Sequence, residues 1–147
     1  MTKPRIPLLD VNVLVALAWP NHQFHGAARE WFTQHSGEGW ATTPPTESGF
    51  VRVSSNRTVL RSVASPATAI ELLGQLKDLP GHAFWPDLVE MVVGQHVNPT
   101  RMTGHRQVTD AHLVAIALEN RGRLVTFDSS IVELVDDRSA IEVLSGS

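Results

Sequence analysis

Two carboxylates follow apolar segments at opposite ends of the chain. Asp10 comes directly after the apolar residues 6–9, and Asp128 comes directly after residues 124–127. In α/β proteins, the residues at the carboxyl end of a buried strand lie where such folds bind their ligands. Either acid alone would most simply cap the helix that follows it. Two such acids in one small domain favour a shared pocket.

Two further acids, Glu47 and Asp110, each follow a threonine. We expect Thr46 and Thr109 to cap helices, which places each carboxylate in a first helical turn. There the helix dipole favours negative charge by about 0.3–1 kcal/mol, so helix stabilisation alone would explain these acids. Asp87 has the same local setting after a proline, and we assign it only a role at a helix start. Spacing alone does not distinguish the three cases.

Four carboxylates that converged without a neighbouring cation would repel one another. A divalent metal ion would relieve this repulsion, and carboxylate oxygens are ligands that Mg²⁺ accepts. Asn12, two residues after Asp10, could order the loop by hydrogen bonding to its backbone. His22 and His25 could share a helix face, but this segment offers too few ligands for zinc.

The composition is that of one globular domain spanning residues 1–147. Hydrophobic residues make up 42% of the chain and charged residues 18%. The chain has no cysteine, which excludes disulfides, thiolate zinc sites and cysteine nucleophiles. The longest apolar segment, residues 11–19, is interrupted by Asn12 and is too short to span a bilayer. We therefore expect a soluble, cytoplasmic protein without a membrane partner.

Basic residues are concentrated beside two of the four acids, although the net charge is −3. No acid lies between Glu47 and Glu71 or between Glu90 and Asp110. These two stretches contain Arg52, Arg57, Arg61, His96, Arg101, His105 and Arg106. One interpretation is chance clustering on a solvated surface. The other is an acidic pocket with a basic rim, which suits a phosphate backbone.

Apolar periodicity and turn residues predict alternating strands and helices. We expect strands at 6–9, 40–43, 82–85, 123–127 and 140–144, and helices at 12–18, 24–35, 46–54, 65–77, 86–93, 110–121 and 131–135. Ser65-Pro66 is a clear start for the helix at 65–77. Gly122 is expected to close the helix at 110–121. Such alternation implies an α/β fold with a mostly parallel sheet of roughly five strands, covered by helices on both faces.

Four segments carry a resemblance to a known family. They are residues 8–14 (LLDVNVL), 46–52 (TESGFVR), 104–113 (GHRQVTDAHL) and 126–128 (TFD). In these segments the chain resembles the PIN-domain nucleases and, among them, the VapC-type toxins of bacterial toxin–antitoxin pairs. The order aspartate, glutamate, aspartate, aspartate spans nearly the whole chain and matches the family at all four acids. Residues 56–97 match only in pattern.

The resemblance implies a PIN-like, three-layer α/β/α domain that cleaves RNA with one or two Mg²⁺ or Mn²⁺ ions and leaves a 5′-phosphate. The implied catalytic and metal-binding residues are Asp10, Glu47, Asp110 and Asp128, supported by Asn12, Thr46 and Thr109. The candidates for RNA binding are Arg52, Arg106 and His105. The implied partners are RNA, a cognate VapB-type antitoxin and a second copy of the chain, with operator DNA bound only through the antitoxin.

Two other functions remain open from the sequence. A phosphatase with Asp10 as nucleophile would need an acid two residues later, where this chain has Asn12. It would also need an active-site lysine, and neither Lys3 nor Lys77 is well placed for this role. A PIN-like binding module without catalysis is the second alternative, and the four intact acids speak against it.

Overall fold

Five short strands form one parallel sheet with Asp10 at the end of its central strand. The computed structural model describes residues 5–56, 64–91 and 96–146. The strands are β1 (Pro7–Leu9), β2 (Trp40–Thr42), β3 (His82–Phe84), β4 (Arg123–Thr126) and β5 (Ile141–Val143). Their order is β3-β2-β1-β4-β5, and every neighbouring pair is parallel. The predicted parallel sheet is therefore confirmed, and the ends of β1 and β4 are neighbours.

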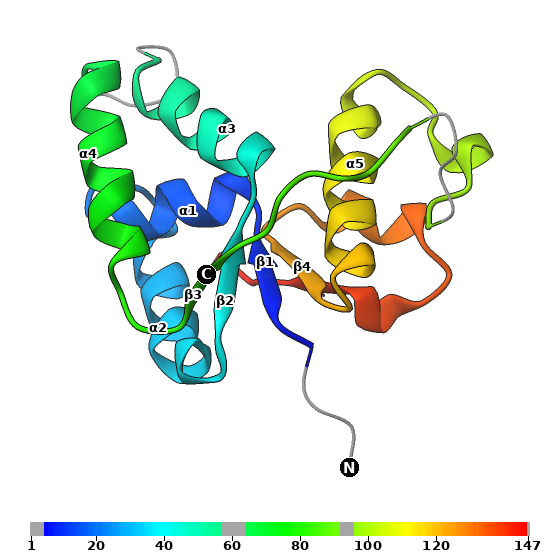
Figure 1. The fold of residues 1–147 in the computed structure, drawn as a ribbon, viewed down its shortest axis with the longest axis horizontal. Coiled ribbons are helices and arrows are strands. Elements are labelled where there is room, and N and C mark those ends of the chain that lie inside the picture. Colours follow the sequence, from blue (N-terminus) through cyan, green and yellow to red (C-terminus); the bar gives the residue numbers. More distant parts are fainter. Residues whose placement is uncertain (1–4, 57–63, 92–95, 147) are drawn as a thin grey trace.

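Helices cover both faces of this sheet (Figure 1). One layer contains α1 (Val11–Ala18), α2 (His25–His35), α3 (Pro44–Ser54) and α4 (Pro66–Lys77), and the other contains α5 (Arg106–Glu119). Short 3₁₀ helices are η1 (Ser36–Glu38), η2 (Pro99–Arg101), η3 (Ser129–Leu134) and η4 (Arg138–Ala140). No helix of the described residues is long and apolar enough to cross a membrane. The three-layer α/β/α architecture expected from the sequence is confirmed.

Alternation along β1 and β4 assigns their side chains to two cores. Leu8 and Leu124 pack with the apolar face of α5, whereas Leu9 and Val125 pack with residues of α1 to α4. All four side chains are fully buried. Because both faces of each strand are apolar, the first polar side chains emerge at the carboxyl ends of the strands.

Helix α3 begins earlier than predicted. Its N-cap is Thr43, and two prolines occupy the first positions of the helix. Proline fits there because those positions need no backbone N–H donor. Thr46 is therefore not the N-cap residue but the N3 residue of a capping box. Its buried hydroxyl accepts a hydrogen bond from the Thr43 N–H (3.0 Å) and donates to the Thr43 carbonyl (2.9 Å). Glu47 remains in the first turn, as expected.

Helix α5 also begins before the predicted residue, at Arg106, so Thr109 is not a cap and Asp110 lies beyond the first turn. The Gln107 side chain accepts a hydrogen bond from the Thr103 N–H and stabilises this earlier start. The helix ends at Glu119, and the left-handed residue after it is Arg121 (φ 56°) rather than glycine.

Gly122 is needed for a close approach of chain segments instead of a helix cap. A Cβ atom at this position would lie 2.5 Å from the Ile6 carbonyl oxygen and 2.6 Å from the Trp85 ring. Only glycine allows the chain to enter β4 at this distance from β1.

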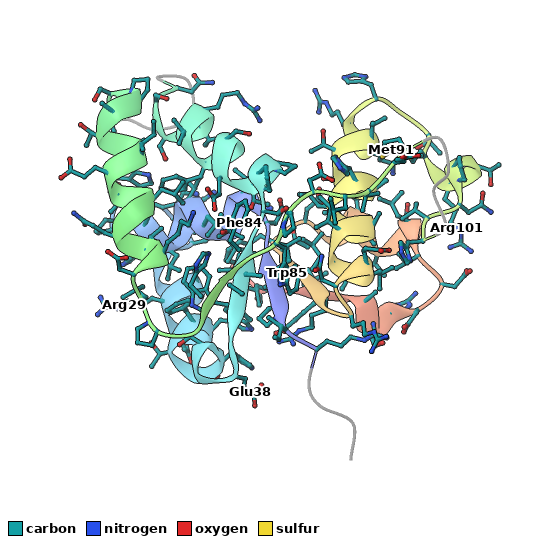
Figure 2. All side chains as sticks on the ribbon, viewed as in Figure 1. Arg29, Glu38, Phe84, Trp85, Met91 and Arg101 are labelled. Carbon is teal, nitrogen blue, oxygen red and sulfur yellow. The ribbon has the colours of Figure 1, made fainter. Side chains whose placement is uncertain are left out.

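The predicted helix at 86–93 is wrong for residues 86–91, which are irregular, and the rest of it lies outside the described residues. This segment leaves β3 at Phe84 and Trp85 and crosses toward α5 at Met91 (Figure 2). Asp87 accepts a hydrogen bond from the Val89 N–H and has no helix to start. Its Oδ2 lies 2.9 Å from His112 Nε2, a close contact without hydrogen-bond geometry. The helix predicted at 131–135 is the 3₁₀ helix η3.

Candidate active site

Asp10 lies at the junction of β1 and α1, where both oxygens of its carboxylate are held. Oδ1 accepts a hydrogen bond from the Val11 N–H (2.7 Å), which caps α1. Oδ2 accepts one from the Thr126 hydroxyl (2.8 Å). Asp10 is only 7% exposed. Its carboxylate is thus fixed in direction at the carboxyl edge of the sheet.

Thr126, the last residue of β4, connects the ends of the two central strands. Its buried hydroxyl donates to Asp10 and accepts from the Asp128 N–H (3.0 Å) and the Asn12 side-chain NH₂ (3.2 Å). The Asn12 carbonyl oxygen in turn accepts from the Phe127 N–H (3.2 Å). These bonds hold the loop that carries Asp128 against the start of α1.

Three of the four expected acids line one pocket. Its cavity of about 300 Å³ is bordered by Asp10, Asp110 and Asp128 together with Val11, Asn12, Val15, His22 and Val53. Because α5 runs antiparallel to β4, Asp110 near its start faces the carboxyl ends of the strands. No lysine or arginine belongs to the described lining. The described lining therefore gathers three carboxylates, with His22 as its one basic side chain.

The carboxylates perturb one another electrostatically. Burial, followed by the charges of Asp10 and Asp128, raises the pKa of Asp110 to about 6. Burial also raises the pKa of Asp10, although its hydrogen bonds from Thr126 and the Val11 N–H act in the opposite direction. A bound cation would remove this repulsion and keep both groups ionised.

Glu47 lies outside the pocket lining and has a cationic partner. Its Oε2 is 2.9 Å from Lys77 Nζ on α4 and accepts a hydrogen bond from the Thr42 hydroxyl (2.7 Å). That hydroxyl is also 2.7 Å from His82 Nε2, which can donate to it. Burial and the Lys77 charge lower the pKa of His82 and favour its neutral ring. Lys77, which the sequence did not connect with any acid, thus balances the charge of Glu47.

The pocket offers oxygen ligands and space for water, a combination that fits Mg²⁺ or Mn²⁺. Among the described residues, no three His, Asp or Glu side chains lie close enough together to hold one metal ion. Mutual repulsion of the carboxylates opposes a closer approach, and a cation would favour it.

A glycine brings α3 close enough to α1 to complete the pocket wall. A Cβ atom at Gly49 would lie 2.5 Å from the Val11 side chain, the residue directly after Asp10. Val53, one helical turn further along α3, lines the pocket. A larger residue at position 49 would therefore push α3 away from the pocket.

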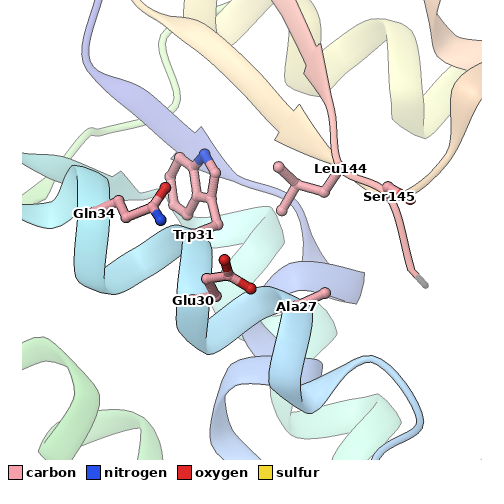
Figure 3. Close-up of a pocket in the computed structure, with 6 residues that line it drawn as sticks. All are labelled: Ala27, Glu30, Trp31, Gln34, Leu144 and Ser145. Carbon is pink, nitrogen blue, oxygen red and sulfur yellow. The ribbon is translucent and has the colours of Figure 1, made fainter.

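A second hollow lacks this chemistry. It measures about 270 Å³ and is lined by Ala27, Glu30, Trp31, Gln34, Leu144 and Ser145 (Figure 3). Glu30 is the one carboxylate among its described lining residues, and the indole N–H of Trp31 donates to Glu142 (2.8 Å). One acid cannot form a metal site, so the pocket of three aspartates is the candidate active site.

The expected RNA-binding residues are at the surface. Arg52 is exposed in the last turn of α3, and His105 and Arg106 are exposed where α5 begins, four or five residues before Asp110. Arg101 is paired with Asp136. Arg57 and Arg61 lie outside the described residues.

Comparison with known proteins agrees with this arrangement. The model of the PIN domain matches residues 8–136, a stretch that includes all three pocket aspartates and Glu47. The chain belongs to the PIN-domain family. It is 54% identical over 139 residues to Ribonuclease VapC39 of Mycobacterium tuberculosis, covering 93% of this chain and 98% of the relative. It is 46% identical over 140 residues to Ribonuclease VapC38 of the same species, with 94% and 97% covered. These relatives place this PIN domain among the VapC proteins.

Sequence reasoning missed three polar residues of this PIN domain. In the sequence, Thr126 belongs to an apolar strand segment, although a threonine shortly before an acid is a usable signal. The sequence suggests only zinc binding for His22 and connects Lys77 with no acid. The neighbours of these residues are distant in the chain, so no local pattern indicates their contacts.

Proposed function

We propose that this VapC-type PIN domain is a divalent-metal-dependent endoribonuclease that acts as the toxin of a toxin–antitoxin pair. The observation that carries the proposal is the pocket lined by Asp10, Asp110 and Asp128, whose described lining contains no lysine or arginine. The raised pKa of Asp110 and of Asp10 supports it, because such charge favours a cation. The printed names of the relatives, which are ribonucleases, agree with this activity.

The three aspartates would hold Mg²⁺ or Mn²⁺. The ion would activate a water molecule and stabilise charge on the phosphodiester. Thr126 orients Asp10 through its hydroxyl, and Asn12 holds the loop before Asp128. Glu47 is the fourth acid of the family pattern. Because Lys77 balances its charge, we propose that it contributes less to metal binding than the aspartates do.

RNA would reach the pocket along its basic rim. Arg52, Arg106 and His105 are exposed on the two helices that border the pocket and would bind backbone phosphates. By its resemblance to the family, the protein would leave products with 5′-phosphates. Hydrolysis by an activated water needs no 2′-hydroxyl nucleophile. Preference for RNA would then come from shape and contacts.

The proposed partners are a VapB-type antitoxin and a second copy of the chain, with operator DNA bound only through the antitoxin, in the cytoplasm. An arginine of the antitoxin could enter the pocket and pair with two carboxylates at once. Inhibition would then weaken as the Mg²⁺ concentration rises. Inhibition that is independent of metal would instead indicate that the antitoxin blocks access of RNA.

The test is cleavage of total bacterial RNA by the purified protein, with Mn²⁺ or with EDTA, followed by sequencing of the new ends. We expect Mn²⁺-dependent cleavage with 5′-phosphate ends. Asp110→Asn should lower the rate at least about a hundredfold, on the order of 3 kcal/mol in the barrier. Asp78→Asn, which removes an exposed carboxylate outside the pocket, is the matched control. Absence of cleavage by the parent protein would favour the non-catalytic binding module.

A further inference from the structure

His22 lines the acidic pocket, and no role has been assigned to it. It lies in the turn between α1 and α2 and faces the same cavity as the three aspartates. Among the described lining residues, ionised aspartates accept hydrogen bonds but cannot donate them. The valine side chains neither donate nor accept hydrogen bonds. The Asn12 amide already binds Thr126 and the Phe127 N–H. His22 is therefore the lining side chain best able to donate a hydrogen bond to a ligand.

The hydrogen bonding of the His22 ring determines which nitrogen carries the proton. Its Nδ1 accepts a hydrogen bond from the Phe24 N–H (3.0 Å), so a neutral ring is protonated on Nε2. Burial, followed by the charge of His25, lowers the pKa of His22 and favours the neutral ring. With its proton on Nε2, the ring offers a donor and not the free electron pair that a metal ligand needs.

Both ends of the turn that carries His22 are fixed to neighbouring helices. The His25 ring donates from Nδ1 to the Ala16 carbonyl of α1 (2.8 Å). At the other end, the indole N–H of Trp19 donates to the Ser54 hydroxyl of α3 (2.9 Å). The donor of His22 is thus positioned before any ligand binds, which is the condition for efficient electrostatic stabilisation.

The same turn is also fixed to the loop of Asp128. The Phe24 ring stacks on the Phe127 ring with 5.0 Å between the centroids. Because Phe127 directly precedes Asp128, this contact sets the position of the His22 turn relative to one of the pocket acids.

We propose that His22 contacts the substrate and donates a hydrogen bond from Nε2 to a non-bridging oxygen of the scissile phosphate. This inference rests on the proposed ribonuclease function, because the phosphate next to the three aspartates is then the one that is cleaved. The aspartates attract a cation, and His22 supplies a neutral donor that does not compete with it for the carboxylates. A donor aimed at a developing negative charge acts mainly on the chemical step.

Two substitutions separate the hydrogen bonds of the His22 ring. In His22→Asn, the side-chain oxygen can replace Nδ1 as the acceptor for the Phe24 N–H, while the Nε2 donor is lost. In His22→Gln, the amide NH₂ can reach the position of Nε2 and restore the donor. Gln23→Ala, an exposed residue of the same turn outside the pocket lining, is the control.

The experiment uses the RNA segment that the parent protein cuts fastest in total bacterial RNA. We expect His22→Asn to lower kcat about a hundredfold with little change in KM, as for loss of one oxyanion donor. His22→Gln should recover part of this loss, and Gln23→Ala should cleave like the parent. The Mn²⁺ affinity of the RNA-free protein, measured by calorimetry, should be the same in all four proteins.

Two results would overturn the role of His22 while leaving the proposed function intact. One is cleavage by His22→Asn at the parent rate. The other is a large loss of Mn²⁺ affinity in His22→Asn, which would make His22 a metal ligand. If the parent protein shows no Mn²⁺-dependent cleavage, the proposed function fails, and the inference about His22 fails with it.

Discussion

Asp110→Asn should make the metal-free protein more stable while it removes activity. Asp110 holds its proton more tightly in the folded protein, where its pKa is about 6, than in the unfolded chain, where it is near 3.8. Between these values the folded state retains a proton that the unfolded state has released. The free energy of unfolding therefore falls as the pH rises through this window, and the loss is complete above pH 6. The Asp110→Asn variant lacks this titrating group, so its free energy of unfolding does not fall in this way.

The size of the effect follows from the shift. About two pKa units correspond to roughly 3 kcal/mol at about 1.4 kcal/mol per unit. Asp110 is only half-buried, so solvent screening reduces the expected gain to about 1 kcal/mol. The gain should be close to zero near pH 4 and reach its plateau by pH 7. A divalent ion at about a hundred times its Kd would stabilise the parent by about 2.7 kcal/mol and the variant much less, which reverses the order.

The assay is urea denaturation of both proteins, followed by tryptophan fluorescence, from pH 4.5 to 8 with EDTA or Mg²⁺. We expect the variant to be the more stable protein with EDTA at pH 7.5 and the less stable one with Mg²⁺. A variant that is less stable than the parent with EDTA would refute it. A stability difference that does not depend on pH would show that the raised pKa of Asp110, caused by burial and by the neighbouring carboxylates, is not its source.

Four further substitutions test the roles of Glu47, Thr126 and the two surface arginines. Glu47→Gln should raise the Kd for Mn²⁺ by a factor at least about ten times smaller than Asp110→Asn does, because Lys77 already balances the charge of Glu47. Equal increases in Kd would place Glu47 among the main ligands. Thr126→Val should lower the free energy of unfolding by about 1–3 kcal/mol, since its buried hydroxyl hydrogen-bonds with three polar groups, one of which is the buried Asp10 carboxylate; an unchanged urea midpoint would contradict this. Arg52→Ala and Arg106→Ala should each reduce the slope of log K against log salt for RNA binding by about 0.7, and unchanged slopes would make them ordinary surface residues.

The sheet and two of the pocket acids could be predicted from the sequence because their signals are local. An apolar segment buried on both faces identifies β1 and β4, and the first acid after each strand must then emerge at the same edge. Asp10 and Asp128 follow directly from this rule. The helix boundaries were less accurate, because two prolines at the start of α3 and the Gln107 side chain at the start of α5 favoured earlier starts than the threonines.

The positions of Glu47 and His22 could not be predicted from local patterns. The local sequence around Glu47 indicates a helix start whether the side chain faces the aspartates or Lys77. Lys77 lies thirty residues later, on another helix. His22 is far in sequence from Asp110 and Asp128, and only the packing of its turn against Phe127 brings it to their pocket. In both cases tertiary contacts determine the chemistry of the side chain.

The central claim is that Asp10, Asp110 and Asp128 together bind one divalent cation. The most direct test is the anomalous diffraction of Mn²⁺ in crystals of the protein, with data collected on both sides of the manganese absorption edge. The account predicts a peak in the pocket about 2.0–2.2 Å from carboxylate oxygens of these aspartates, with Glu47 still bound to Lys77. A peak at Glu47 without the aspartates, or no peak in the pocket under conditions where Mn²⁺ supports cleavage, would contradict it.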